Sequence, residues 1–517
     1  MNYAGLRRVH HVAGVAIVLA WAFTMGRMGW TRYRERGTAP EMSVGQLLAE
    51  GAGETRTFGV YNGDAKIGYA ASRRMKTAGG YLFADQAIWE MTLQGTKQRL
   101  VADSQAVVGE DFGMKTFRSR VDAGVAKMSA QGRVEGNVLV VRFDTAGRTY
   151  EDRQPLDGPA ILPAMVRPAI AARNPKPGSS YVLSIFNPLA RGVEQIEVLV
   201  EGRETIKTAI GDVNAWRIQE ILRGSIKTQV WIDDAGDTVR EISPLGMRME
   251  VEPREKAISM PAGSGAVPDL IVAVRVPVKG DLEASIATGR VIVDLEGVDL
   301  KDFPLLAGGR QIFAGTRLAV DALRTPVAYP LPYSGGDHDA DLAPESLIQS
   351  TDPEIVATAR KIVAGAADSV VATQRIHAWV HDNLRKENSA GVPSAVEVLQ
   401  TKSGDCNEHT VLFVALARAA GIPARMAIGV VWANARGAGP GVYYHAWPEV
   451  YLGRVGSSMP GAGDRAEGWY AVDPTLGQIP ADAGHLRFLV GGLEKQVDLL
   501  KLIGHLSIVV TPPGAHP

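Results

Sequence analysis

The stretch Leu399-Gln-Thr-Lys-Ser-Gly-Asp-Cys406-Asn-Glu-His-Thr-Val-Leu-Phe413 contains the single cysteine of the 517-residue chain. A lone thiol has no disulfide partner within the chain, so the sequence excludes a disulfide scaffold and an all-cysteine metal site. Residues 407–420 repeat apolar side chains at helical spacing, and Gly421 followed by Pro423 ends the pattern. The sequence therefore predicts that Cys406 lies where a loop enters a helix.

A helix N-terminus gives a cysteine a distinct electrostatic environment. Unpaired backbone N–H groups and the helix macrodipole stabilise an anion there, which predicts a thiol pKa below the free value of about 8.5. The same N–H groups, including that of Cys406, are suited to stabilising an oxyanion on an attacked carbonyl. The position favours a reactive thiol, whereas a lone cysteine elsewhere is usually a small buried apolar residue.

Two downstream segments supply groups that can act with a thiol. Residues 424–432 and the segments that begin at His445 and Trp469 have the alternation typical of strands. Neighbouring strands of one sheet can bring His445 and Asp473 side by side. A thiol, an imidazole and a carboxylate serve as the nucleophile, the base and the orienting group of covalent acyl transfer. We therefore predict that Cys406, His445 and Asp473 form one catalytic site.

Four of these segments resemble the transglutaminase-like core of bacterial proteins. They are Ser403-Gly-Asp-Cys406-Asn-Glu-His-Thr410, Arg418-Ala-Ala-Gly-Ile-Pro-Ala-Arg425, Tyr444-His445-Ala-Trp447 and Val472-Asp473-Pro-Thr475. The resemblance implies an α+β domain with papain-like geometry and a Cys-His-Asp triad. In that triad Cys406 matches the nucleophile, His445 the base and Asp473 the orienting acid. No metal or organic cofactor is implied.

The aromatic residues beside the predicted base leave two interpretations open. Tyr444 and Trp447 flank His445, and they either line a substrate-binding groove or belong to the core. Alternation along a strand places Trp447 on the same face as His445.

Other histidines offer competing interpretations. Cys406, His409 and His445 are possible zinc ligands, but the sequence offers no evident fourth ligand, so we expect His409 to point off the helix or to make a surface contact. His377 and His381 are spaced i, i+4 as in a zinc-protease motif, but the glutamate of that motif is missing. We therefore expect a solvated helix face there, and predict no metal site.

The composition describes folded material in more than one domain. The chain is too long for one ordinary core, and 46% of its residues are hydrophobic and 21% charged. A formal net charge of −1 gives no reason to expect nucleic acid as a partner. Period-two segments predict a large antiparallel β-rich domain over residues 41–258, with one helical interruption near residues 159–172. Its strand rhythm loosely resembles the half-barrel sheets of periplasmic lipoprotein-sorting proteins.

The second half of the chain follows a Pro/Gly-rich linker. We predict a β-rich connecting region over residues 269–345 and the transglutaminase-like domain over residues 346–510. The whole chain is therefore expected to be α+β.

The N-terminus carries an uncharged apolar run, Val12–Gly26, after Arg7 and Arg8. Because no Ala-x-Ala cleavage site follows the run, we expect residues 1–40 to hold a hydrophobic helix that remains as a membrane anchor rather than a cleaved signal. Arginines flank both sides of the run and leave its orientation open. An arginine pair before an apolar run favours a periplasmic or extracytoplasmic body.

Together these features predict a membrane-anchored, transglutaminase-like cysteine enzyme of the bacterial cell envelope. It is expected to act on amide bonds of a protein or peptide substrate through a thioester. Hydrolysis and transfer to an amine both remain open, as do the identity of the substrate and the oligomeric state. The alternative is a non-catalytic cell-envelope binding or scaffold protein with an inert transglutaminase-like domain.

Overall fold

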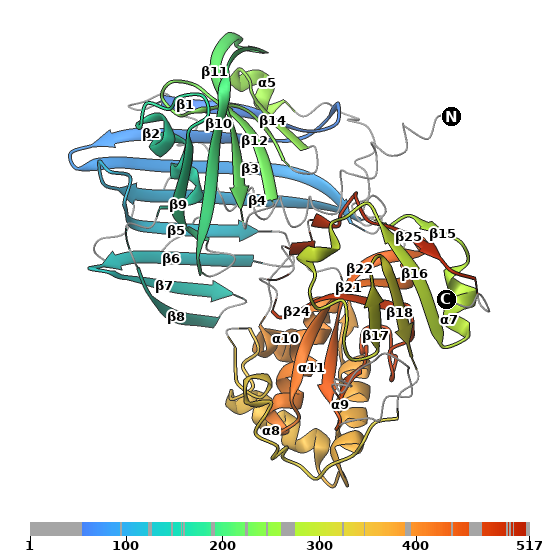
Figure 1. Cartoon of the computed structure of the whole chain (residues 1–517). Helices are drawn as coiled ribbons and strands as arrows, with labels where there is room; N and C mark the ends of the chain where they lie inside the picture. Colours follow the sequence, from blue (N-terminus) through green and yellow to red (C-terminus); the bar gives the residue numbers. More distant parts are fainter. Residues whose placement is uncertain are drawn as a thin grey trace. The chain divides into compact units, whose positions relative to one another are not determined.

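The computed structural model describes residues 54–512 with internal gaps, and the predicted N-terminal hydrophobic helix lies outside the described residues. The gaps are residues 94–95, 123–126, 146–147, 157, 159–160, 188–191, 223–225, 244–246, 260–274, 323–324, 346, 388–393, 436–437, 454–467, 493–494, 496–497 and 500. The chain divides into two compact units, unit 1 (Met1–Ala273) and unit 2 (Val274–Pro517) (Figure 1). None of the helices within the described ranges is long and apolar enough to cross a bilayer.

Unit 1 is built on one sheet of fourteen antiparallel strands, in the order β8 to β1 followed by β14 to β9. The first eight strands are β1 (Glu54–Asn62), β2 (Ala65–Thr77), β3 (Gly80–Leu93), β4 (Thr96–Val108), β5 (Met114–Asp122), β6 (Lys127–Glu135), β7 (Val138–Thr145) and β8 (Arg148–Pro155). The remaining six are β9 (Ser180–Asn187), β10 (Gly192–Thr208), β11 (Gly211–Leu222), β12 (Ile226–Ile232), β13 (Thr238–Ile242) and β14 (Met247–Val251). The predicted large antiparallel β domain is thus confirmed.

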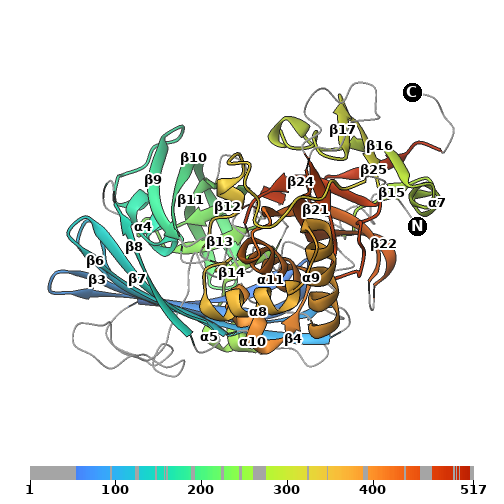
Figure 2. The same ribbon diagram turned by 90° about the horizontal axis from the view of Figure 1, so that it is seen from below.

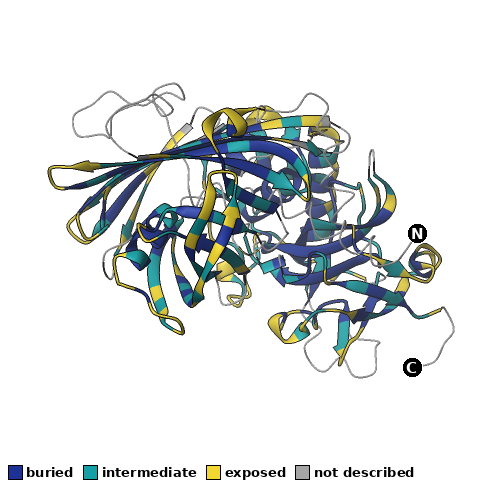
Figure 3. Ribbon diagram, turned by 90° about the horizontal axis from the view of Figure 1, so that it is seen from above, coloured by how far each residue is buried: buried dark blue, intermediate teal, exposed yellow. Residues whose placement is uncertain are grey.

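Alternation along the strands sets which face of this sheet is buried. In β10, Ile196, Val198 and Val200 are buried while the residues between them are more exposed. Figure 3 shows the same contrast between buried strand interiors and exposed hairpin ends. The core joins side chains from both halves of the sheet to the short helices η1 (Pro163–Met165) and α4 (Val166–Ala171). These two helices lie within the predicted helical interruption, and α5 (Arg254–Ile258) follows the last strand.

The described residues of unit 2 form two larger sheets and one strand pair. The five-stranded sheet has the order β15 (Val278–Lys279), β25 (Ser507–Val510), β16 (Arg290–Glu296), β18 (Arg317–Asp321) and β17 (Gln311–Ala314). The four-stranded sheet has the order β23 (Trp469–Ala471), β22 (Gly439–Tyr451), β21 (Ala424–Ala435) and β24 (His485–Val490). The pair is β19 (Arg385–Lys386) with β20 (Ser403–Gly404). The predicted connecting region thus supplies strands to a sheet that the C-terminal β25 completes.

The helices of unit 2 pack around one central helix. They are α7 (Leu282–Ala287), η2 (Leu300–Asp302), η3 (Asp339–Asp341), α8 (Pro353–Val363), α9 (Ser369–Asn383), α10 (Ala395–Thr401) and α11 (Cys406–Ala419). Helix α11 contacts α8, α9 and α10 as well as β21 and β22. Figure 2 shows α8, α9 and α11 along one face of the four-stranded sheet. Eleven consecutive residues of α11, Glu408 to Arg418, are buried, so this helix is the centre of the core.

Candidate active site

Cys406 is the first residue of α11, as predicted. The carboxylate of Asp405 accepts the backbone N–H of Asn407 at 2.9 Å, and the carboxylate of Glu408 accepts the backbone N–H of Asp405 at 2.8 Å. This reciprocal capping fixes the start of the helix. Gly404 precedes it with φ +155°, and a Cβ there would lie 2.1 Å from Cγ of Glu408. The Gly-Asp-Cys sequence therefore holds the thiol at one defined point of the loop-to-helix turn.

The environment of the thiol differs from the sequence expectation. Burial raises the pKa of Cys406 well above its usual value, and the neighbouring charge of Asp405 raises it further. A hydrogen bond from the backbone N–H of Ala446 acts in the opposite direction and lowers this pKa. The prediction of a lowered thiol pKa is wrong, because the helix N-terminus that stabilises an anion is here capped by the Asp405 carboxylate and the thiol is partly buried. The resting thiol is therefore protonated at neutral pH.

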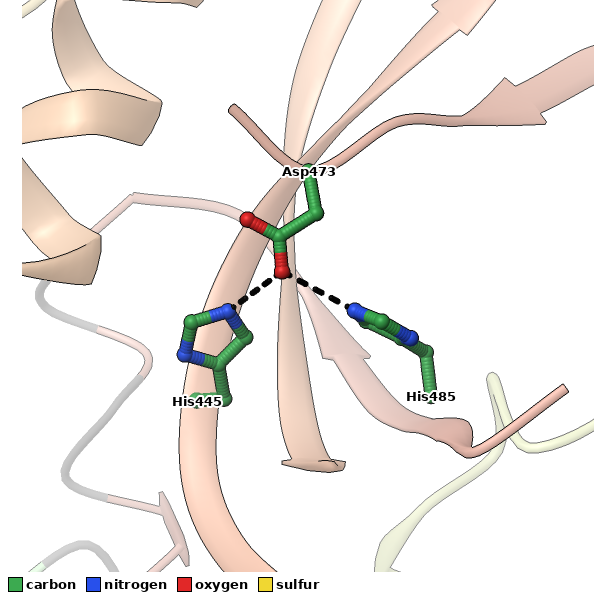
Figure 4. A group of neighbouring side chains, drawn as sticks. All are labelled: His445, Asp473 and His485. Carbon is green, nitrogen blue, oxygen red and sulfur yellow. Dashed lines mark hydrogen bonds and ion pairs between the residues drawn. The ribbon is translucent and has the colours of Figure 1, made fainter. Parts of the chain in front are cut away.

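His445 and Asp473 form a direct pair at the end of the four-stranded sheet. Nε2 of His445 on β22 lies 2.8 Å from Oδ2 of Asp473, two residues beyond β23 (Figure 4). Asp473 is fully buried, and its Oδ1 accepts the backbone N–H of Leu476 at 2.9 Å. Burial alone would raise the pKa of Asp473, but His445 and His485 hold it well below its usual range. The carboxylate is therefore ionised and fixed in orientation.

The first turns of α11 meet β22 next to this pair. The backbone N–H of Ala446 donates to the sulfur of Cys406, and the Thr410 hydroxyl donates to the backbone carbonyl of Ala446 at 3.1 Å. Ala446 directly follows His445 in the chain, so the start of α11 lies beside the part of β22 that carries the His445–Asp473 pair. Since Nε2 of His445 faces Asp473, Nδ1 is the ring nitrogen on the opposite side (Figure 4).

A second histidine, to which the sequence analysis assigned no role, contacts the same carboxylate. His485 is the first residue of β24 and is fully buried. Its Nε2 lies 3.0 Å from Oδ2 of Asp473, and its Nδ1 lies 3.0 Å from Oδ1 of Asp482. The sequence offered little to identify this residue, because Gly484-His485 has no motif of its own and is marked only by its place late in the transglutaminase-like domain. The contact depends on the pairing of β24 with β21, which no spacing in the sequence reveals.

Two further histidines hold the backbone around Asp473. His377 on α9 is 5% exposed, and its Nε2 lies 3.1 Å from the backbone carbonyl of Asp473. Nδ1 of His381 lies 2.8 Å from the carbonyl of Pro474. Burial lowers the pKa of His377, so its neutral ring donates to the carbonyl. The prediction of a solvated helix face is wrong here, because this face of α9 packs against the loop that carries the acid.

His409 also departs from the expectation of a surface contact. It is fully buried, and its Nδ1 lies 2.7 Å from the backbone carbonyl of Asp405. Burial lowers its pKa, so the ring is neutral. That prediction is wrong because α11 is covered by other elements on all sides.

The aromatic neighbours of His445 fall on opposite faces of β22. Trp447 is 1% exposed and packs with Ala427, Ala471 and Ala481, and its ring centroid is 6.2 Å from that of His445. Of the two interpretations, the structure therefore gives Trp447 the core position. Tyr444 is half-buried against the main core, and burial raises its pKa.

His445, Asp473 and His485 are also the candidate metal-binding group within the described ranges. Their ligand atoms lie within 4.8 Å of one another. However, both imidazole nitrogens point directly at Oδ2 of Asp473 at hydrogen-bond distances of 2.8 and 3.0 Å. Two N–H donors, one of them fully buried, and one carboxylate satisfy one another in this geometry. We therefore interpret the group as a hydrogen-bond network.

The fold and the network define an α+β domain with a cysteine on a helix N-terminus and a His-Asp pair on an adjoining sheet. Residues 356–474 match the family model of the Transglutaminase-like superfamily, and they include Cys406, His445 and Asp473. Unit 2 therefore carries a transglutaminase-like core, which confirms the resemblance seen in the sequence. Among curated proteins, none matches the chain.

Several solved structures share some similarity with this chain. A candidate cysteine protease from Cytophaga hutchinsonii is 16% identical, with 42% of this chain and 83% of that chain covered and a TM-score of 0.26. A beta-barrel-like protein of a domain of unknown function from Brucella abortus is 13% identical, with 39% and 95% covered and a TM-score of 0.31. A candidate protease from Parabacteroides distasonis is 10% identical, with 71% and 68% covered and a TM-score of 0.18.

Proposed function

We propose that this chain is a cysteine enzyme that acts on amide bonds through a thioester intermediate. The observation that carries the proposal is the meeting of α11 with β22. There the sulfur of Cys406 accepts the N–H of Ala446, beside a His445–Asp473 pair at 2.8 Å. A thiol nucleophile, a base and an orienting acid are the minimum machinery for acyl transfer, and the thiol and the base here lie on elements that pack together. The match of this region to the transglutaminase-like family supports the same chemistry.

The proposed acylation step begins from a protonated thiol. Nδ1 of His445 takes the proton as the sulfur of Cys406 forms a bond to the amide carbon. The backbone N–H of Cys406, at the start of α11, stabilises the oxyanion of the tetrahedral intermediate. The carbon–nitrogen bond then breaks, and the His445 imidazolium returns its proton to the departing amine. Asp473 stabilises the imidazolium while it exists.

The thioester is then resolved by a second nucleophile. Water, deprotonated by His445, gives a carboxylic acid and the free thiol, which is a peptidase or amidase outcome. A primary amine gives a new amide and the free thiol, which is a transfer outcome. The proposed substrate is a protein or peptide, because its amide bonds can be either hydrolysed or exchanged for a new amide.

The proposed location is the cell envelope. The apolar run Val12–Gly26 and the arginine pair that precedes it are the reasons for proposing a membrane-anchored chain with an extracytoplasmic body.

A non-catalytic binding protein is the second candidate, and one observation favours it. Burial and the Asp405 carboxylate raise the pKa of the Cys406 thiol, whereas reactive cysteines usually have a lowered pKa. In the catalytic account this thiol becomes a nucleophile only when His445 removes its proton. In the binding account it stays inert.

An electrophilic thiol probe separates the two candidates. Iodoacetamide labelling of Cys406, the single cysteine of the chain, is expected at neutral pH and is expected to fall at least tenfold in His445→Ala. His338→Ala is the matched control, because it removes a half-buried imidazole outside the triad. Equal labelling rates in wild type and His445→Ala would contradict the enzyme proposal.

A further inference from the structure

Four titratable side chains form a continuous line through the core of unit 2. His445 pairs with Asp473 at 2.8 Å, Asp473 pairs with His485 at 3.0 Å, and His485 pairs with Asp482 at 3.0 Å. His485 and Asp473 are fully buried, and Figure 4 shows the two imidazoles directed at one carboxylate oxygen. The proposed mechanism uses only the first pair, so the second histidine and the second carboxylate need an explanation.

The hydrogen bonds that Asp473 and Asp482 accept indicate that both carboxylates are ionised. Oδ1 of Asp482 accepts the backbone N–H of Gly484 at 2.9 Å, and its Oδ2 accepts the side-chain amide of Gln478 at 2.9 Å. Asp473 accepts the N–H of Leu476 in addition to its histidines. Both carboxylates are thus surrounded by donors and are ionised.

The two ring nitrogens of His485 therefore each face an anionic acceptor. A neutral imidazole has one N–H and one lone pair, and the fully buried ring would turn that lone pair towards a carboxylate oxygen at 3.0 Å. Only the doubly protonated ring makes both hydrogen bonds.

We propose that His485 is a buried imidazolium that positions Asp473 and shares its negative charge, so that Asp473 stabilises a protonated His445 less than an unshared carboxylate would. The inference rests on the proposed function and assigns His485 and Asp482 as positioning residues for the Cys406 reaction. A base that holds its proton less tightly returns it more readily to the departing amine.

Other charged or titratable groups around His485 do not reverse this assignment. Arg310, which precedes β17, donates to the backbone carbonyl of His485 at 3.2 Å, and its charge disfavours a second cation. Burial also lowers the pKa of His485, yet Asp473 and Asp482 together raise it above its ordinary value. On the remaining sides lie His445, the edge of the Trp447 ring at 5.1 Å and the neutral His377 behind Asp473.

Nitrogen NMR of the full chain with labelled histidine tests the charge directly. In Cys406→Ala, where no turnover interferes, the His485 ring is expected to show two protonated nitrogens at pH 7. His485→Gln assigns the signal by its loss. A His485 ring with one protonated nitrogen at pH 7 would overturn the inference.

The coupling to His445 is tested by removing the distal carboxylate. In Cys406→Ala/Asp482→Asn, His485 loses one anionic acceptor and its second proton, so Asp473 acts on His445 with its full charge. The nitrogen NMR signals of the His445 ring at pH 7 are then expected to differ from those in Cys406→Ala. Asp341→Asn is the matched control, because Asp341 pairs with His338 at the same i, i+3 spacing outside the site. Unchanged nitrogen signals of the His445 ring would overturn the positioning role.

These results are separable from the test of the proposed function. If labelling of Cys406 depends on His445 while His485 carries one proton, this inference fails and the enzyme proposal stands. If His485 carries two protons while labelling does not depend on His445, the enzyme proposal fails.

Discussion

The two units of this chain each bury a cluster of opposite charges, and the clusters differ in the type of cation. In unit 1, Arg167 on α4 donates to Glu220 at 2.8 Å and 2.9 Å, and lies 2.6 Å from a carboxylate oxygen of Glu241. Thr238 accepts a further Arg167 N–H at 2.9 Å. Desolvation would lower the pKa of this guanidinium, but the two glutamates raise it above its usual value.

In unit 2, the corresponding cation is the imidazolium that we infer at His485, between Asp473 and Asp482. A guanidinium stays charged throughout the accessible pH range, so the unit 1 cluster can only hold elements together. An imidazole changes charge near neutral pH, and the unit 2 cluster ends at His445 beside a thiol. Similar burial and pairing therefore give unit 1 a charge cluster that only stabilises the fold. In unit 2 they give a cluster whose protonation changes near neutral pH.

The largest expected effect comes from removing the thiol. Cys406→Ala is expected to reduce amide turnover at least about 10³-fold, because the nucleophile is lost. The free energy of unfolding is expected to change by less than about 1 kcal/mol, since a small half-buried side chain loses only one atom. Turnover of a peptide amide and urea unfolding check the two quantities. Residual turnover near the wild-type rate would show that Cys406 is not the nucleophile, and would contradict the assignment of a catalytic site to unit 2.

The next effect is on stability in unit 1. Arg167→Met removes the guanidinium that pairs with the buried Glu220 and Glu241, and it is expected to cost about 3–5 kcal/mol in the free energy of unfolding of this unit. The labelling rate of Cys406 in folded protein is expected to stay unchanged. Hydrogen exchange of peptides from β11 and β13 measures the local stability.

A surface pair provides the control for that substitution. Arg203 pairs with the exposed Asp234 at 2.8 Å, and Arg203→Met is expected to cost less than about 1 kcal/mol. If both substitutions lower the free energy of unfolding equally, the buried cluster does not stabilise unit 1 more than a surface ion pair does.

The pH dependence of stability distinguishes the two clusters in one experiment. The pKa of His485 is raised in the folded state, so its contribution is complete below the unfolded value of about 6.5 and is lost as the pH rises through the folded value. The pKa of Asp473 is lowered, so its contribution is present above about 3.9 and is lost as the pH falls. Hydrogen-exchange protection of β24 is therefore expected to decrease above neutral pH.

Protection of the Arg167 region is expected to stay level over the same range, because its guanidinium does not titrate there. His485→Gln is expected to flatten the pH dependence of β24. A level profile for β24 in the wild-type protein would contradict the assignment of a titrating cation.

The smallest effect concerns the cap of α11. Asp405→Asn keeps the side-chain oxygen that accepts the N–H of Asn407 and removes the charge that raises the thiol pKa. The pH at which iodoacetamide labelling of Cys406 reaches half its maximum is therefore expected to fall. An unchanged midpoint would show that burial alone sets the thiol pKa.

Much of the site was predictable from the sequence, because local chemistry fixes it. The Gly-Asp-Cys turn, the apolar spacing after it and Gly421 place Cys406 at a helix start, and alternation places His445 on a strand. The family resemblance then joins these segments to Asp473. The signals for the helix start and for the strand are each local in the sequence.

The remainder depends on contacts between distant segments. His377 lies 96 residues before Asp473, and its burial follows from the packing of α9 on that loop. The charge of His485 follows from two carboxylates that only the folded chain brings to its ring. The raised pKa of Cys406 likewise reflects burial, which periodicity around a helix start does not reveal.

The central claim is that Cys406 accepts an acyl group with the help of His445. The most direct measurement is mass spectrometry of the intact protein after brief mixing with a peptide amide and acid quenching. The account predicts an added acyl mass on the peptide that contains Cys406, its loss in His445→Ala, and faster decay of the adduct when a primary amine is present if transfer is the outcome. Absence of any adduct, with substrate unchanged after long incubation, would contradict the account.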